Sequence, residues 1–69
     1  MEWDRIESNW KQYMGSARQQ WGRISEDELD MIAGARKTLS GQIQEVYGIS
    51  RDEAEKQVEA WRGQQKEMS

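Results

Sequence analysis

The 69-residue sequence contains no cysteine, histidine or phenylalanine. The absence of cysteine excludes a disulfide and a thiolate metal site, and it leaves the redox compartment undetermined. Aliphatic residues are also scarce, because Leu, Ile and Val together number nine. A chain of this size buries only about 60% of its unfolded surface, and this one has no disulfide bond to stabilise it. We therefore expect one small domain of marginal stability.

Long apolar runs are missing as well, and the longest is Met31–Ala33. This run is far shorter than the ~20 residues that span a bilayer, and no basic-then-apolar leader is recognisable. The mean hydropathy is −1.14 and the net charge is −3. Together with the missing span and leader, these values indicate a soluble, cytoplasmic protein. The length leaves room for a single domain, which we place at residues 3–63. Residues 64–69 lack apolar periodicity and are expected to form a flexible tail.

Apolar residues in the first third of the chain recur at helical spacing. They fall within a stripe roughly 100° wide when placed on a helix, which is typical of an amphipathic helix. Asp4 is a candidate N-terminal cap, and Gly22 suits the left-handed residue that closes a helix. The pattern predicts a first helix from Asp4 to Trp21.

Two capping boxes mark the starts of later helices. One pairs Ser25 with Glu28, and the other pairs Ser50 with Glu53. In a capping box the serine oxygen accepts the amide three residues on, while the glutamate carboxylate reaches back to the serine amide. We therefore expect these four residues to be structural caps.

The chain also contains an approximate internal repeat. An offset of about 26 residues aligns Gly15 with Gly41 and Trp21 with Tyr47, and the two Ile-Ser-x-Asp-Glu segments align after a one-residue slip. Each copy reads as a long helix, a turn and a shorter helix. The repeat predicts an all-α fold, in which two packed helical hairpins form a four-helix array.

Glycines define further features of this array. Gly34 is expected to break the second helix from the third, and Gly63 to end the fourth. Glycine inside a helix costs about 0.5–1 kcal/mol relative to alanine, so Gly15 and Gly41 call for a packing reason. We expect them to lie where the two hairpins cross closely.

Large aromatic side chains compensate for the scarcity of aliphatic ones. Trp10, Trp21, Tyr47 and Trp61 fall on the predicted inner faces and are expected to form the core. Trp3 lies outside this set. It either covers one end of the bundle, which we favour, or belongs to a partner-binding patch.

Several segments together resemble one protein family. They are WDRIE (3–7), NWKQ (9–12), QWG (20–22), DELDMIAG (27–34) and IQEVYGISRDEAEKQV (43–58). Over residues 3–62 the chain resembles the CsbD-like family of small bacterial general-stress proteins. The resemblance implies a short protein, abundant under stress and without an assigned activity, and a sterile-alpha-motif-like pair of helical hairpins. Residues 13–18 are less lysine-rich than is usual for the family.

No catalytic, cofactor or metal site is predicted. The acidic pairs at 27–28 and 52–53 lie in first turns of helices, where the helix dipole favours negative charge. The acidic segment 26–30 lacks the alternating ligands and glycine of a calcium loop. A Walker-type phosphate loop is absent from the sequence.

The predicted function is therefore a non-enzymatic binding or adapter module of a stress response. Its candidate partner surface carries Lys11, Arg18, Arg36 and Lys37. One alternative is a hydrophilin-like protectant of other macromolecules. A second is a weak helix-hairpin-helix-like nucleic-acid binder at residues 48–50, although the net negative charge disfavours it. We expect a protein partner and a monomer, with a homodimer as the alternative.

Overall fold

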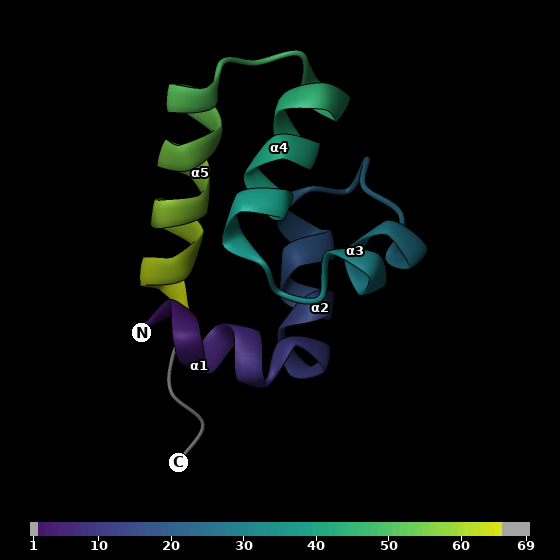
Figure 1. Ribbon diagram of the computed structural model, residues 1–69, viewed down its shortest axis with the longest axis vertical. Coiled ribbons are helices and arrows are strands. Elements are labelled where there is room, and N and C mark those ends of the chain that lie inside the picture. Colours follow the sequence, from purple (N-terminus) through teal and green to yellow (C-terminus); the bar gives the residue numbers. More distant parts are fainter. Residues whose placement is uncertain (1, 66–69) are drawn as a thin grey trace.

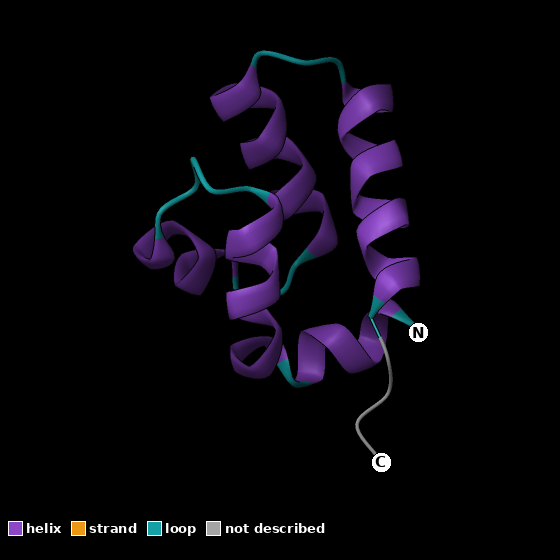
Figure 2. Cartoon of the chain, turned by 180° about the vertical axis from the view of Figure 1, so that it is seen from behind, coloured by secondary structure: helices purple, strands orange, loops and turns teal. Residues whose placement is uncertain are grey.

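The computed structural model describes residues 2–65, and these form five helices and no strand. The helices are α1 (Trp3–Ser8), α2 (Trp10–Gln20), α3 (Glu26–Ile32), α4 (Arg36–Tyr47) and α5 (Arg51–Gln64). Figures 1 and 2 show α4 and α5 side by side and antiparallel, joined at one end of the bundle. Helix α1 crosses the opposite end (Figure 1). The expected all-helical class is confirmed.

The predicted first helix is wrong, because the chain breaks it into α1 and α2 at Asn9. The Asn9 backbone leaves helical geometry with φ −117° and ψ 32°. Its side-chain Nδ2 donates to the carbonyl oxygen of Arg5 at 2.9 Å. An asparagine side chain that bonds nearby backbone competes with helix continuation. The predicted Asp4 cap is also wrong, since Glu2 occupies the N-cap position and Asp4 lies in the first turn.

Two predicted helix ends differ from the structure. Among residues 2–65 the glycines with positive φ are Gly34 and Gly48, so Gly22 is not the left-handed closing residue. Gly63 lies inside α5, which continues to Gln64. The Nε2 atom of Gln65 donates to the Trp61 carbonyl at 3.1 Å. The rest of the predicted tail, residues 66–69, lies outside the described residues.

The predicted break at Gly34 is present. Helix α3 ends at Ile32, its C-cap residue Ala33 has φ 54°, and Gly34 follows with φ 79°. These two consecutive left-handed residues redirect the chain into α4. An added Cβ at Gly34 would lie 2.9 Å from the Cα of Glu7, so α1 packs directly onto this turn. Only glycine allows both the backbone conformation and the close approach.

The predicted close crossing at Gly15 and Gly41 is wrong. Both glycines are exposed, and a Cβ added to either would meet nothing within 4 Å. The close approach of backbones occurs at Gly34, between elements that the repeat does not relate. The two mid-helix glycines therefore have no packing role inside the fold.

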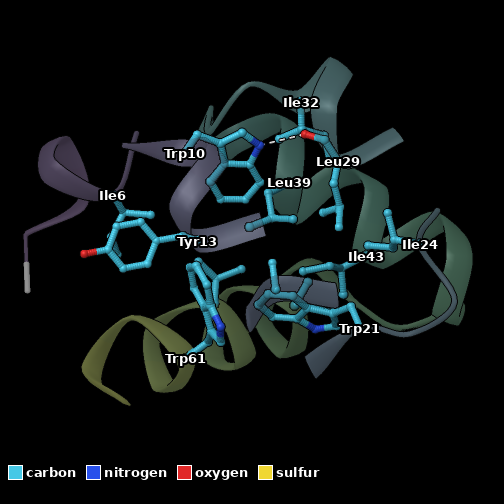
Figure 3. Close-up of a cluster of buried hydrophobic side chains, with 13 residues drawn as sticks. Ile6, Trp10, Tyr13, Trp21, Ile24, Leu29, Ile32, Leu39, Ile43 and Trp61 are labelled. Carbon is cyan, nitrogen blue, oxygen red and sulfur yellow. Dashed lines mark hydrogen bonds between the residues drawn. The ribbon is translucent and has the colours of Figure 1, made fainter. Parts of the chain in front are cut away.

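Four aromatic rings of the protein pack against the Trp61 ring, which is part of the buried core (Figure 3). Its centroid lies 5.9 Å from that of Trp3 and 6.3 Å from that of Trp10, both edge-on. Tyr13 packs edge-on at 6.5 Å, and Trp21 packs in a tilted arrangement at 5.6 Å. Edge-to-face pairs at this separation are favourable beyond the area that they bury. A single residue of α5 thus contacts one ring from α1, two rings from α2 and the ring of Trp21, the C-cap residue of α2.

Two indole N–H groups donate to backbone carbonyls of distant segments. Trp10 Nε1 donates to the Leu29 oxygen at 2.7 Å and ties α2 to α3 (Figure 3). Trp3 Nε1 donates to the Gly34 oxygen at 2.8 Å and ties α1 to the turn before α4. Trp3 therefore covers one end of the bundle.

The other two indoles donate to side chains. Trp21 Nε1 donates to Gln57 Oε1 at 3.0 Å, and Trp61 Nε1 donates to Ser16 Oγ at 3.2 Å. Both bonds join the α2 segment to α5. No buried side-chain nitrogen or oxygen in the described part of the chain lacks a partner. Satisfying each buried polar group avoids a desolvation cost of about 1–3 kcal/mol.

The glycine contacts predict opposite effects of alanine substitution. Gly15→Ala and Gly41→Ala should each raise the free energy of unfolding by roughly 0.5–1 kcal/mol, because helix propensity improves and nothing clashes. Gly48→Ala should lower it by about 1–2 kcal/mol through left-handed strain alone. Gly34→Ala should lower it further, because strain and clash with Glu7 add. Urea titrations followed by circular dichroism measure all four, and destabilisation by Gly15→Ala would contradict this account.

The position of Trp61 predicts that its removal abolishes folding. Trp61→Ala should cost about 3–5 kcal/mol, which is comparable to the whole stability of a domain this small. We expect a coil-like far-ultraviolet circular dichroism spectrum in buffer. Met31→Ala, at an exposed site, should change stability by less than about 0.5 kcal/mol and serves as the control. Cooperative unfolding of Trp61→Ala near the wild-type midpoint would be the contrary result.

Candidate binding surface

The serines of the two predicted capping boxes occupy helix N-caps. Ser25 Oγ accepts the Glu28 N–H at 3.2 Å, and Ser50 Oγ accepts the Glu53 N–H at 3.2 Å. The Glu28 carboxylate accepts from the Ser25 hydroxyl at 3.3 Å and from Gln42 Nε2. Glu28 therefore also joins α3 to α4. Both serines therefore cap their helices through a backbone amide, and the Glu28 carboxylate bonds the serine hydroxyl where the sequence predicts the serine amide.

The predicted core aromatics divide into two groups. Trp10, Trp21 and Trp61 are buried, whereas Tyr47 is half-buried at the edge of the core. The Tyr47 hydroxyl accepts the Arg23 N–H at 3.1 Å, and the Arg23 guanidinium lies 5.7 Å from the ring centroid. Tyr13, which the sequence reasoning left out of the aromatic core, is 8% exposed and packs on Trp61.

The structure divides the four cations of the predicted partner surface between two helices. Lys11 and Arg18 lie on α2, and Arg36 and Lys37 lie in the first turn of α4. The Arg18 guanidinium lies 4.0 Å from the Glu26 carboxylate, and that of Arg36 lies 2.8 Å from the Glu59 carboxylate. Lys11 and Arg36 line different surface depressions. Two of the four charges are thus balanced by acidic neighbours.

Glu59 is the centre of a small ion-pair cluster on α5. Arg36 lies 2.8 Å and Arg62 2.9 Å from its carboxylate oxygens. Hydrogen bonding from Arg62, together with the charges of Arg36 and Arg62, lowers the pKa of the Glu59 carboxyl. The same hydrogen bond and the Glu59 charge raise the pKa of Arg62. These guanidinium groups are engaged within the protein, so the cluster does not offer them to an external anion.

A trough lies between α2 and α3. Two depressions of about 430 and 420 Å³ share Lys11 and Asp30 and together form it. We define the α2–α3 trough by the residues that line these depressions: Glu7, Ser8, Asn9, Trp10, Lys11, Gln12, Met14, Gly15, Glu26, Asp27, Asp30 and Ala33. Four carboxylates and one ammonium line it. The sequence reasoning singled out the acidic segment of α3 but not this groove.

The described part of the chain shows neither a cluster of metal ligands nor a membrane-spanning helix. Within residues 2–65, acidic side chains form no group that could hold a metal ion. None of the helices in the described segment combines the length and the apolarity needed to cross a bilayer.

The Glu59 cluster predicts a small dependence of stability on pH. Because the folded-state pKa of Glu59 is lowered, the unfolded state binds more protons over the interval between the two pKa values, and stability rises with pH there. The contribution is complete above the ordinary carboxyl pKa and is lost as pH falls through the folded value. Solvent screening limits it to at most about 1 kcal/mol.

The variant that tests this cluster is Glu59→Gln. It should be less stable than the wild type at neutral pH and should match it in strong acid, as measured by urea titrations across pH. Glu45→Gln removes the same charge from an exposed site of α4 and serves as the control. Equal losses from both variants at neutral pH would show that the ion pairs contribute nothing.

Comparison with known proteins places the chain among small bacterial relatives. The family model described as CsbD-like matches residues 4–56. The UPF0337 protein NE2439 of Nitrosomonas europaea is 49% identical over 61 residues, which cover 88% of this chain and 65% of that protein. The chain thus spans less than two thirds of NE2439.

Other relatives are covered more completely. The UPF0337 protein YjbJ of Escherichia coli K12 is 44% identical over 61 residues, which cover 88% of each chain. The UPF0337 protein RPA4217 of Rhodopseudomonas palustris is 44% identical, with 88% of this chain and 92% of that protein covered. No solved structure matches the chain. Since the family model covers most of the sequence and these relatives align over nearly all of it, the chain belongs to the CsbD-like family.

Proposed function

We propose that this protein is a non-enzymatic adapter that docks a macromolecular partner in the cytoplasm during stress. The observation that carries the proposal is Met31, which is 84% exposed on α3 and adds nothing to the core. It is the one large hydrophobic side chain that stands so far into solvent among the described residues. Methionine is common at binding surfaces because its flexible thioether adapts to different partners.

The way the fold uses its reactive side chains also supports a binding role. The serines of both capping boxes accept backbone amides, and the four indole N–H groups all have acceptors. No histidine or cysteine is present to act as a base or nucleophile. The association with stress rests on the family resemblance.

The proposal includes the sterile-alpha-motif-like arrangement of two hairpins. Contacts of α2 with α3 and of α4 with α5 support it, since these pairs are the two copies of the repeat. Helix α1 is an addition to this scheme, and it packs across the end of the bundle (Figure 1).

The alternatives have weaker support. A hydrophilin-like protectant is favoured only by composition, and it needs no defined surface. Nucleic-acid binding through residues 48–50 would place phosphates beside Asp52 and Glu53 on a chain of net charge −3. Ser50 Oγ is already engaged by the Glu53 amide at 3.2 Å. Binding of phosphate depends on cationic neutralisation, which this turn does not provide.

The adapter proposal is tested by photo-crosslinking in stressed cells, with the reactive residue placed in turn at exposed positions of every helix. An adapter gives one recurrent adduct of fixed stoichiometry, identified by mass spectrometry. A protectant gives no discrete adduct, and it protects unrelated enzymes from drying at high dose. The absence of any discrete adduct would contradict the adapter.

A further inference from the structure

Gly15 is a residue of the α2–α3 trough that has no side chain. It lies in the middle of α2, where glycine is unfavourable relative to alanine. A Cβ added there would meet no protein atom within 4 Å, so no internal contact requires glycine. Gly15 lines the trough beside Met14. A side chain at this position would therefore extend into the trough and occupy it.

The trough combines apolar surface with negative charge. Its first depression is bounded by Trp10 and Ala33, and its second by Met14. The carboxylates of Glu7, Glu26, Asp27 and Asp30 line it, against Lys11. Arg18, at 4.0 Å from Glu26, balances one of these carboxylates in part. The trough thus carries excess negative charge around the apolar residues that line it.

Met31 stands next to this trough on α3. It follows Asp30 directly and lies one helical turn beyond Asp27, and both of these residues line the groove. A partner lying along α3 would cover the exposed thioether as well as the groove. The two features therefore belong to one continuous surface.

We propose that the α2–α3 trough, with Met31 at its side, docks a basic segment of a partner protein that carries lysine or arginine around an apolar side chain. This inference rests on the proposed adapter function and names its surface and partner class. Complementary charge steers such a segment to the acidic groove, and the apolar side chain enters between α2 and α3. The same charge repels nucleic acid and anionic lipid headgroups.

A second copy of the chain is a poorer occupant of the trough. Each copy carries a net charge of −3, so two copies repel one another. Arg36 and Arg62 of a second copy are already paired with Glu59. A partner of opposite charge suits the groove better.

The first test uses fluorescein-labelled synthetic peptides with lysines around a single leucine. Matched peptides replace the lysines with glutamate, or the leucine with serine. The basic apolar peptide should bind saturably, and raised salt should weaken the binding because the charges are screened. In ¹⁵N-labelled protein it should shift the amides of residues 10–15 and 27–33 most strongly.

Gly15→Gln is the variant that separates the trough from the rest of the surface. Gly41→Gln is its matched control, because Gly41 is exposed, mid-helical and equally free of neighbours, but does not line the trough. Gly15→Gln should weaken peptide binding about tenfold, since its side chain fills the depression beside Met14, while Gly41→Gln leaves binding unchanged. Both variants should retain the wild-type fold by circular dichroism, since glutamine is a good helix former.

Several outcomes would overturn the inference. They are equal binding by the two glutamine variants, amide shifts centred on α4 and α5, preference for the glutamate peptide, and dimerisation that buries the trough. If crosslinking in cells captures a discrete partner and Gly15→Gln does not reduce the yield of that adduct, the trough is not the docking site, while the proposed adapter function still holds. If no discrete partner is captured from any position, the adapter itself fails.

Discussion

The packing of four aromatic rings around the Trp61 indole is the interaction on which the rest of the structure depends. Nine aliphatic residues cannot supply the buried area of a stable core, so the large rings supply it. Each indole also carries a polar N–H that costs free energy if it is buried without a partner. The N–H groups of all four tryptophans, Trp61 included, donate to an acceptor on another segment of the chain. Ring packing and hydrogen bonding therefore favour the same arrangement.

Trp10 connects this core to the proposed binding surface. Its ring packs on Trp61, its N–H holds the carbonyl of Leu29 in α3, and part of its surface lines the α2–α3 trough. The residue that fixes α3 against α2 therefore also shapes the groove between them. A chain with so few apolar residues can keep a defined groove because the walls are held by the core itself. Gly15 lines this groove without a side chain of its own.

Local sequence signals predicted the local structure well. Both capping serines, the break at Gly34 and the inward tryptophans follow from spacing alone. The break at Asn9 does not follow from spacing, because the apolar stripe continues through it and a side-chain hydrogen bond to the backbone interrupts the helix. The trough does not follow from spacing either, since it depends on how α2 and α3 pack against each other. The predicted close crossing at Gly15 and Gly41 is wrong for the same reason, since a repeat in sequence does not show what lies beside a residue in space.

Hydrogen exchange of the indole N–H groups tests the central claim most directly. In ¹⁵N-labelled protein the indoles of Trp10, Trp21 and Trp61 should give separate signals that exchange slowly and at one common rate, because they are released only when the whole domain unfolds. Addition of urea should accelerate all three together. Indole signals that collapse to the position of free tryptophan, or that exchange as fast as an unstructured peptide, would contradict a core built around Trp61.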